Sequence, residues 1–189
     1  MIFNNPSDIC DFYIDKVIAP GDVVVDATVG NGNDTLKLSN AVGEAGKVIG
    51  FDIQAEAIKS AKEKNYIYNN VVFLNESHSN MELYLDEKIS FAIFNLGYLP
   101  GGDHSIMTTE ETTIPAIEKA MSYLKEDGVI VLVIYRGGDT GFSESEAVTS
   151  YIKGIDYKKF NVILFDYANR PKNPPMVCVI EKKSVNKVV

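Results

Sequence analysis

The sequence predicts an α/β fold of the Rossmann-like kind, with a seven-stranded, mostly parallel sheet whose last strand is antiparallel. Short β-branched runs alternate with helical segments along the chain, which is the pattern of a parallel sheet covered by helices. A Gly-rich turn around Gly30 and Gly32 follows the first of these runs. A segment rich in Asn and Pro, residues 169–175, separates the last two runs and suits a closing antiparallel hairpin.

The expected elements occupy the chain from its first β-branched run to its last. Parallel strands are expected at Val23–Asp26, Val48–Asp52, Val71–Leu74, Phe91–Asn95 and Val129–Tyr135. Helices are expected at Thr35–Val42, Ala55–Asn65, Ser79–Leu85, Glu111–Leu124 and Glu144–Lys153. The final hairpin is expected to pair Phe160–Tyr167 with Met176–Glu181. These elements leave no room for a separate RNA-binding domain, so residues 1–189 are expected to form one domain.

Composition predicts a cytoplasmic globular protein, because hydrophobic residues make up 46 % and charged residues 23 % of the chain. The acidic first twenty residues do not resemble a secretory signal, and no apolar run approaches the roughly 20 residues that cross a bilayer. Cys10 and Cys178 lie in no metal-spacing pattern. We expect two reduced, packed thiols, with a disulfide between them as the open alternative.

The net charge of −8 argues against broad, non-specific binding to nucleic acid, which depends on many phosphate contacts. An RNA substrate would therefore have to meet a local basic patch, or a patch completed across a homodimer. No His, Cys and carboxylate cluster has metal-ligand spacing, so no metal is expected.

The clearest candidate ligand site is the turn after the first strand, where a carboxylate, Asp26, ends the strand. Gly30 and Gly32 let the backbone turn tightly and approach a ligand without a Cβ in the way. Asn31 and Asn33 tolerate left-handed geometry and add amide groups that form hydrogen bonds. The structural alternative is an ordinary strand-to-helix turn with a capped helix.

A second carboxylate, Asp52, ends the next strand, twenty positions after Gly32. In this layout such a carboxylate accepts hydrogen bonds from both ribose hydroxyls of a nucleoside, and Gln54 is placed to contact the ribose or the adenine edge. After the third strand, Ser77 and His78 are candidates for adenine contact. The alternatives are a helix cap for Asp52 and a buried structural role for His78.

The nucleoside is expected to be S-adenosylmethionine rather than a dinucleotide. A dinucleotide turn favours a third Gly, where this chain has Thr35. Asp26 would repel a pyrophosphate but suits the cationic amino-acid end of S-adenosylmethionine, directly or through water. The turn departs from the acid-x-Gly-x-Gly-x-Gly pattern of methyltransferases only at Thr28. The sequence therefore predicts a class I methyltransferase.

The loop after the fourth strand is the candidate acceptor site. Asn95-Leu-Gly-Tyr98 resembles the Asn/Asp-Pro-Pro-Tyr loop of amino-directed methyltransferases, with Leu-Gly in place of Pro-Pro. An Asn oxygen and a backbone carbonyl there can orient an amine, and Tyr98 offers a flat surface on which a base can stack. Asp103 and His104 follow in the same loop and could relay a proton. A structural turn with Tyr98 in the core is the alternative.

The whole chain resembles the bacterial YtqB-like family of putative rRNA methylases. The matching runs are Asp26–Thr35, Gly50–Gln54, Phe94–Asp103, Thr108–Ile114 and Asn173–Pro175. The resemblance implies methylation of the aminomethyl group of wobble 5-aminomethyl-2-thiouridine in tRNA, and therefore a primary amine as acceptor. After the fifth strand the family tends to carry Gly-His-x-Gly-Gly, where this chain has Tyr135-Arg-Gly-Gly-Asp139. Arg136, Arg170 and Lys172 are the candidates for contact with tRNA phosphates.

Three other functions stay open at this point: methylation of a small-molecule amine, methylation of rRNA, and nucleoside binding without turnover. An electropositive surface beside the Asn95 loop favours RNA, whereas a closed neutral pocket favours a metabolite. Cofactor retention without methylation of any tRNA pool would indicate a binding module.

Overall fold

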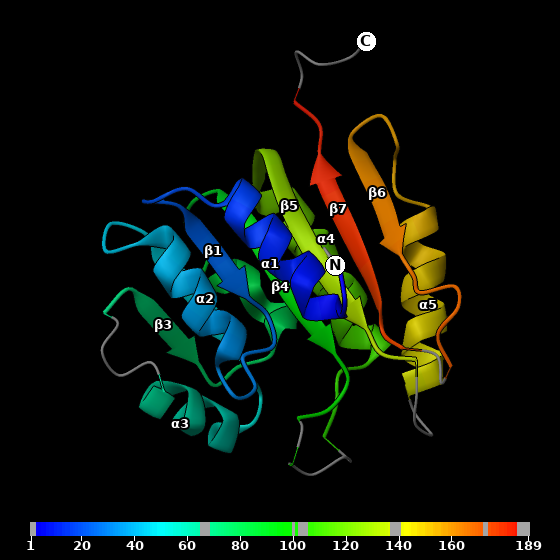
Figure 1. Ribbon diagram of the computed structural model, residues 1–189. Coiled ribbons are helices and arrows are strands. Elements are labelled where there is room, and N and C mark those ends of the chain that lie inside the picture. The colour runs from blue at the N-terminus through cyan, green and yellow to red at the C-terminus, as the bar shows by residue number, and fades with distance from the viewer. Residues whose placement is uncertain are drawn as a thin grey trace.

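The computed structural model describes residues 3–64, 69–99, 101, 106–136, 141–171 and 174–184. Its seven strands form one sheet in the order β3-β2-β1-β4-β5-β7-β6 (Figure 1). The strands are β1 Val23–Asp26, β2 Lys47–Phe51, β3 Val71–Leu74, β4 Ile89–Leu96, β5 Leu124–Ile134, β6 Phe160–Phe165 and β7 Met176–Lys182. Strands β1 to β5 pair in parallel, whereas β7 runs antiparallel to both β5 and β6. The predicted sheet with its reversed last strand is confirmed.

Helices cover both faces of this sheet. They are α1 Pro6–Val17, α2 Asn33–Val42, α3 Ala55–Lys64, α4 Glu110–Tyr123, α5 Gly141–Lys153 and the short 3₁₀ helix η1 His78–Leu83. Helices α1 and α2 lie over one face, and α4 and α5 lie over the other (Figure 1). The apolar faces of the helices and strands pack into a core on each side, with Leu38 and Phe91 in one core and Ile117 and Phe94 in the other. None of the described helices is long and apolar enough to span a membrane.

Helix α1 is the element that the sequence analysis missed. Its start carries clear signals, because Asn5 accepts a hydrogen bond from the Asp8 N–H while the Asp8 carboxylate accepts one from the Asn5 N–H. Pro6 at the first helical position adds a second start signal. Ile9 and Ile14 then bury one side of the helix against the sheet. The acidic residues of this segment argued against a secretory signal, and they are the cap and the exposed face of a helix.

The two cysteines lie on opposite faces of the sheet. Cys10 of α1 packs in the core under α1 and α2, whereas Cys178 of β7 packs in the core under α4 and α5. Both are buried and free, which agrees with the expected reduced thiols and leaves no disulfide between them.

The strand order places the carboxyl ends of β1 and β4 side by side. From β1 the chain continues outward to β2 and β3 and then returns to β4 on the other side of β1. In open α/β sheets, ligands bind at such a reversal, beyond the carboxyl ends of the strands. Asp26 is the last residue of β1, and Asn95 is the penultimate residue of β4. Alternation along β4 puts Asn95 on the same face as Phe91 and Ile93, which is the face that α2 covers.

Candidate active site

The Gly-rich turn between β1 and α2 depends on two left-handed glycines. Gly30 has φ of +50° and Gly32, the N-cap of α2, has φ of +72°. Residues with a Cβ rarely adopt these values, so the sequence must place glycine there. The Gly30 N–H donates to Asp52 Oδ2 at 2.8 Å, which joins the turn to the end of β2. Asn31 is exposed, and the Asn33 amide oxygen accepts a hydrogen bond from Lys64 at 2.5 Å.

Asp26 holds this turn against the start of α2. Its side chain is fully buried, and its Oδ2 accepts a hydrogen bond from the Thr35 hydroxyl at 2.5 Å. Its Oδ1 accepts one from the Thr28 N–H at 3.2 Å. Burial, and after it the negative charge of Asp34, raises the pKa of Asp26 to about 7. Contact of Asp26 with the cationic end of the ligand, directly or through water, stays a prediction.

The raised pKa of Asp26 makes stability depend on pH. Between its ordinary value of 3.8 and about 7, the folded state binds this proton more strongly than the unfolded state. The contribution of Asp26 to the free energy of unfolding is therefore highest below pH 4 and falls by roughly 4 kcal/mol as the pH rises through 7.

Asp26→Asn should remove this dependence, because an amide of the same shape can accept from Thr28 and donate to Thr35. Urea unfolding of both proteins at several pH values from 5 to 8 measures the difference. We expect the variant to gain stability relative to the wild type as the pH rises. A difference that stays constant over this range would contradict the assignment.

Asp52 has both carboxylate oxygens partly engaged. Oδ2 accepts the Gly30 N–H, and Oδ1 accepts the Gln54 N–H at 2.9 Å. Each oxygen of a carboxylate can accept two hydrogen bonds, so one position remains on each once the contacts of the described residues are counted. The side chains of Asp52 and Gln54 are half-buried, and Asn75 donates to the Asp52 carbonyl at 2.9 Å. The residue is thus fixed in place with acceptor capacity to spare.

His78 is buried with one ring nitrogen unpaired. Its Nδ1 lies 3.0 Å from the Ala27 carbonyl oxygen, which can only accept, so Nδ1 carries the hydrogen. Burial lowers the pKa of His78, which keeps the ring neutral at pH 7. Its Nε2 is therefore an acceptor, and it is buried without a hydrogen-bond partner among the described residues. Ser77 next to it caps η1 by accepting the Ser79 N–H at 3.2 Å.

The acceptor loop is tied to the Gly-rich turn by direct contacts. The Asn95 N–H donates to the Thr28 hydroxyl at 2.7 Å, and the Asn95 side-chain nitrogen donates to Asp34 Oδ2 at 3.0 Å. A Cβ added at Gly30 would lie 3.4 Å from Leu99 Cδ1, so the loop also packs over the turn. Thr28 replaces the first Gly of the methyltransferase pattern, and its hydroxyl accepts the hydrogen bond that fixes the Asn95 backbone. Asp103 and His104 lie outside the described residues.

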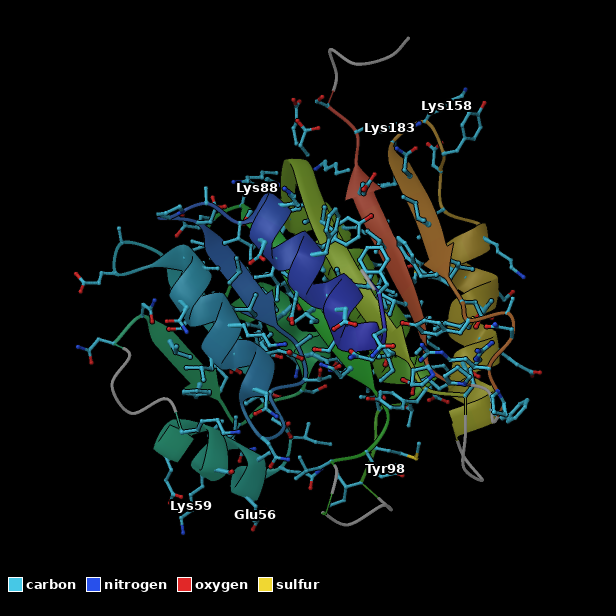
Figure 2. All side chains as sticks on the ribbon, in the orientation of Figure 1. Glu56, Lys59, Lys88, Tyr98, Lys158 and Lys183 are labelled. Carbon is cyan, nitrogen blue, oxygen red and sulfur yellow. The ribbon has the colours of Figure 1, made fainter. Side chains whose placement is uncertain are left out.

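Tyr98 points outward at this end of the molecule, opposite the end that carries Lys88 and Lys158 (Figure 2). The side chain is 46 % exposed, and its backbone pairs with Met107 in an isolated β-bridge. Such exposure rules out the alternative that Tyr98 is a core residue.

The acceptor loop is bound through Thr108 to a buried carboxylate, Glu144, which is not among the candidates predicted from sequence. The Thr108 hydroxyl accepts the Gly97 N–H at 2.8 Å and donates to Glu144 Oε2 at 2.8 Å. Thr113 donates to the other oxygen of Glu144 at 2.7 Å. Glu144 is 4 % exposed, and its burial raises the pKa of its carboxyl group. These contacts explain why Thr108 and Thr113 stand in the family-like run.

Comparison with known proteins decides the family. A family model described as "Putative rRNA methylase" matches residues 48–181. The chain belongs to this family. The match runs from β2 to β7 and includes Asp52, Asn95 and Tyr98.

Two kinds of curated relative are similar to this methylase. The chloroplastic tRNA (mnm(5)s(2)U34)-methyltransferase of Arabidopsis thaliana is 37 % identical over 187 residues, which cover 90 % of this chain and 67 % of the relative. The ribosomal RNA small subunit methyltransferase H of Clostridium botulinum strain Loch Maree is 32 % identical over 189 residues, which cover 92 % of this chain and 57 % of the relative. The chain therefore spans only part of the length of these curated relatives.

Solved structures show the same fold over nearly the whole chain. A putative rRNA-methylase from Clostridium thermocellum superposes with a TM-score of 0.94 at 47 % identity, covering 96 % of this chain and 100 % of that one. A putative methyltransferase from Streptococcus mutans, solved in complex with SAH, gives a TM-score of 0.88 at 34 % identity and covers 95 % of this chain and 99 % of that one. The present chain is an S-adenosylmethionine-dependent methyltransferase.

The residues at the carboxyl ends of β1 and β2 fit this cofactor. The two left-handed glycines let the turn form without a Cβ at either position, and Asp52 keeps an acceptor position on each oxygen among the described contacts. The unpaired Nε2 of His78 is a further acceptor that a ligand donor would satisfy. A buried acceptor without a partner is costly, so its presence beside this turn favours a bound ligand.

Of the three residues expected to contact tRNA phosphates, Arg136 and Arg170 lie among the described residues, and each contacts a side chain of the protein. Arg136 forms two parallel hydrogen bonds with Asp166, at 2.7 and 2.9 Å, and also donates to the Pro174 carbonyl. Its donors thus join the end of β5 to the segment between β6 and β7, and its contact with tRNA phosphate stays a prediction. Arg170 is exposed and stacks 4.0 Å from the centre of the Tyr167 ring, whereas Lys172 lies outside the described residues. No metal-ligating cluster occurs among the described residues.

Proposed function

We propose that this methyltransferase transfers a methyl group from S-adenosylmethionine to a primary amine of tRNA, namely the aminomethyl group of the wobble uridine. The observation that carries the proposal is the orientation of Asn95. Its side-chain nitrogen is engaged with Asp34, so its amide oxygen remains to accept a hydrogen bond from an amine. The name of the Arabidopsis relative, a tRNA (mnm(5)s(2)U34)-methyltransferase, supports the same substrate.

The protein's part in this reaction is positioning. Bound S-adenosylmethionine supplies an electrophilic methyl group on a sulfonium. The amine nitrogen, after losing its extra proton to solvent, forms a bond to the methyl carbon while the carbon–sulfur bond breaks and its electrons pass to sulfur. Asn95 directs the nitrogen lone pair, Tyr98 stacks with the base, and Asp52, Gln54 and His78 hold the nucleoside. Asp103 remains a proposed proton relay.

Ribosomal RNA is the second candidate substrate, because the family description and the small-subunit relatives both name it. The two substrates are separated by incubating the protein with labelled methyl donor and either ribosomal RNA or bulk tRNA that carries unmethylated aminomethyl uridine. Nucleoside mass analysis then identifies the product. We expect label in tRNA, as the methylaminomethyl nucleoside. Label only in ribosomal RNA, in a small-molecule amine, or in nothing would overturn the proposal.

We also propose that the tRNA-binding surface includes Arg170, which follows β6 at the carboxyl-end edge of the sheet, together with Lys172. Arg170→Glu should weaken tRNA binding, lower the slope of log affinity against log salt by about 1, and leave cofactor affinity unchanged. Lys158→Glu makes the same charge change at the opposite end of the molecule (Figure 2) and is the matched control. If tRNA affinity measured by filter binding is equal in the two variants, the RNA surface lies elsewhere or is completed by a second copy in a homodimer.

We further propose that residues 1–189 act as one domain in the cytoplasm. The free, buried state of Cys10 and Cys178 supports a reducing compartment.

A further inference from the structure

Among the described residues, Asp34 at the start of α2 is the only carboxylate that forms a hydrogen bond with the acceptor residue Asn95. A carboxylate can only accept, so the atom of Asn95 that faces Asp34 must be the amide nitrogen. The bond therefore fixes the orientation of the amide, with its oxygen on the other side. The Asp34 side chain is 22 % exposed, so its charge is partly screened but not buried.

The charge of Asp34 is only partly balanced. Lys37 lies 3.5 Å from Asp34 Oδ1, but the same ammonium lies 2.5 Å from Asp11 and 3.0 Å from the Ser7 hydroxyl. Two carboxylates thus share one cation, which leaves a negative charge beside the acceptor loop. The other oxygen of Asp34, Oδ2, faces Asn95 instead of Lys37.

The negative charge of Asp34 acts on the groups around the acceptor site. Burial, and after it this charge, raises the pKa of groups on three other elements, which are Cys10 in α1, Asp26 in β1 and Tyr135 after β5. Tyr135 packs beside the acceptor loop, because its ring lies 3.9 Å from a Cβ added at Gly97. A group bound between Asn95 and Tyr135 would therefore also experience the field of Asp34.

The geometry points to Asp34 as the residue that makes the acceptor site specific for a cationic primary amine. This inference rests on the proposed function and adds a residue to it. Asp34 locks the Asn95 amide with its oxygen toward the amine, and its charge attracts the ammonium form of the substrate. The same charge stabilises the positive charge that builds up on the nitrogen as the new N–C bond forms. Asp34 is a positioning and selectivity residue, because it acts through Asn95 and through its field.

Asp34→Asn tests this role, since it keeps the shape and one acceptor oxygen but removes the charge. Its matched control is Asp11→Asn, which removes the other carboxylate on Lys37 and leaves the Asp34–Asn95 hydrogen bond in place. For Asp34→Asn we expect kcat on aminomethyl tRNA to fall about tenfold, with unchanged affinity for S-adenosylmethionine. We expect Asp11→Asn to stay within about twofold of the wild type.

The pH profile separates this role from a merely structural one. An opposite charge raises the pKa of a bound amine, so its removal should shift the rise of kcat to lower pH, by about half to one pH unit. The Asp11→Asn profile should keep the wild-type midpoint. In the absence of cofactor, the wild type should bind an aminomethyl stem-loop RNA more tightly than the unmodified one, and Asp34→Asn should lose this preference.

A third comparison uses the Asn95→Ala background. If Asp34 acts partly through Asn95, adding Asp34→Ala to Asn95→Ala should slow the reaction less than Asp34→Ala does alone, and the slowing that remains measures the field of its charge. Unchanged kcat and midpoint in Asp34→Asn, or an equal effect of Asp11→Asn, would overturn the role of Asp34 while the wild type still methylates the amine. A wild type that methylates no amine would instead refute the proposed function.

Discussion

Asn95→Ala is expected to lower the methylation rate on aminomethyl tRNA about 100-fold, or about 2.7 kcal/mol of transition-state stabilisation. The structure gives the reason, because Asn95 is fixed by Thr28 through its backbone and by Asp34 through its side chain. An alanine keeps the backbone contact and loses the oxygen that orients the amine. Affinity for S-adenosylmethionine should be nearly unchanged, since no contact of the Asn95 side chain reaches Asp52 or the glycines.

Single-turnover kinetics with saturating cofactor measure this effect directly. Asn161→Ala removes an exposed asparagine from edge strand β6 and serves as the control, with wild-type rate expected. The wild-type rate should rise with pH until the bound amine is deprotonated, because only the neutral amine has a free lone pair. Wild-type rates in Asn95→Ala would remove this residue from the mechanism, whatever the identity of the substrate.

Asp52→Ala is expected to weaken S-adenosylmethionine binding by roughly 2–3 kcal/mol, because hydrogen bonds to a charged acceptor are lost. The structure adds a second effect. Asp52 also accepts the backbone N–H groups of Gly30 and Gln54, so the substitution leaves both without their acceptor. We therefore expect a loss of about 1–2 kcal/mol in the free energy of unfolding of the cofactor-free protein.

Calorimetric titration measures the affinity, and urea unfolding measures the stability. Asp156→Ala is the matched control, because Asp156 accepts the N–H two residues later, at Lys158, as Asp52 does at Gln54. It lies in an exposed turn before β6, far from the glycine turn. Unchanged cofactor affinity in Asp52→Ala would exclude Asp52 from the nucleoside site.

Strand positions were predictable because parallel strands buried on both faces appear as continuous β-branched runs. The runs at Val23–Asp26 and Val71–Leu74 agree with the structure to the residue, and the segment at 169–175 marked the reversal before β7. The capping signals at Asn5 and Pro6 also indicate the start of a helix, but the predicted elements do not include α1. The segment at residues 79–85 was predicted as a helix of unstated type. It forms the 3₁₀ helix His78–Leu83, in which Asn80 has non-helical dihedral angles.

The candidate site likewise contains residues that a short local motif indicates and residues whose partners lie far away in the sequence. Gly30, Gly32, Asp52 and Asn95 could be named as candidates from sequence because each ends a strand or forms a turn within one short motif. The roles of Asp34 and Glu144 depend on hydrogen bonds across 61 and 36 residues, to Asn95 and Thr108, and no local pattern encodes them. Arg136 shows the same limit, since its hydrogen bond to Asp166, 30 residues away, cannot be predicted from the loop in which it stands.

Two anticodon stem-loop RNAs, identical except that one carries an aminomethyl group on its wobble uridine, provide the most direct test of the amine assignment. Each is incubated with the protein and labelled S-adenosylmethionine, and the nucleosides are analysed by mass. We predict one added methyl group on the aminomethyl nitrogen of the first RNA and no label in the second. Methylation of the unmodified RNA, at a ring position or a hydroxyl, would contradict the assignment of the Asn95 site to a primary amine.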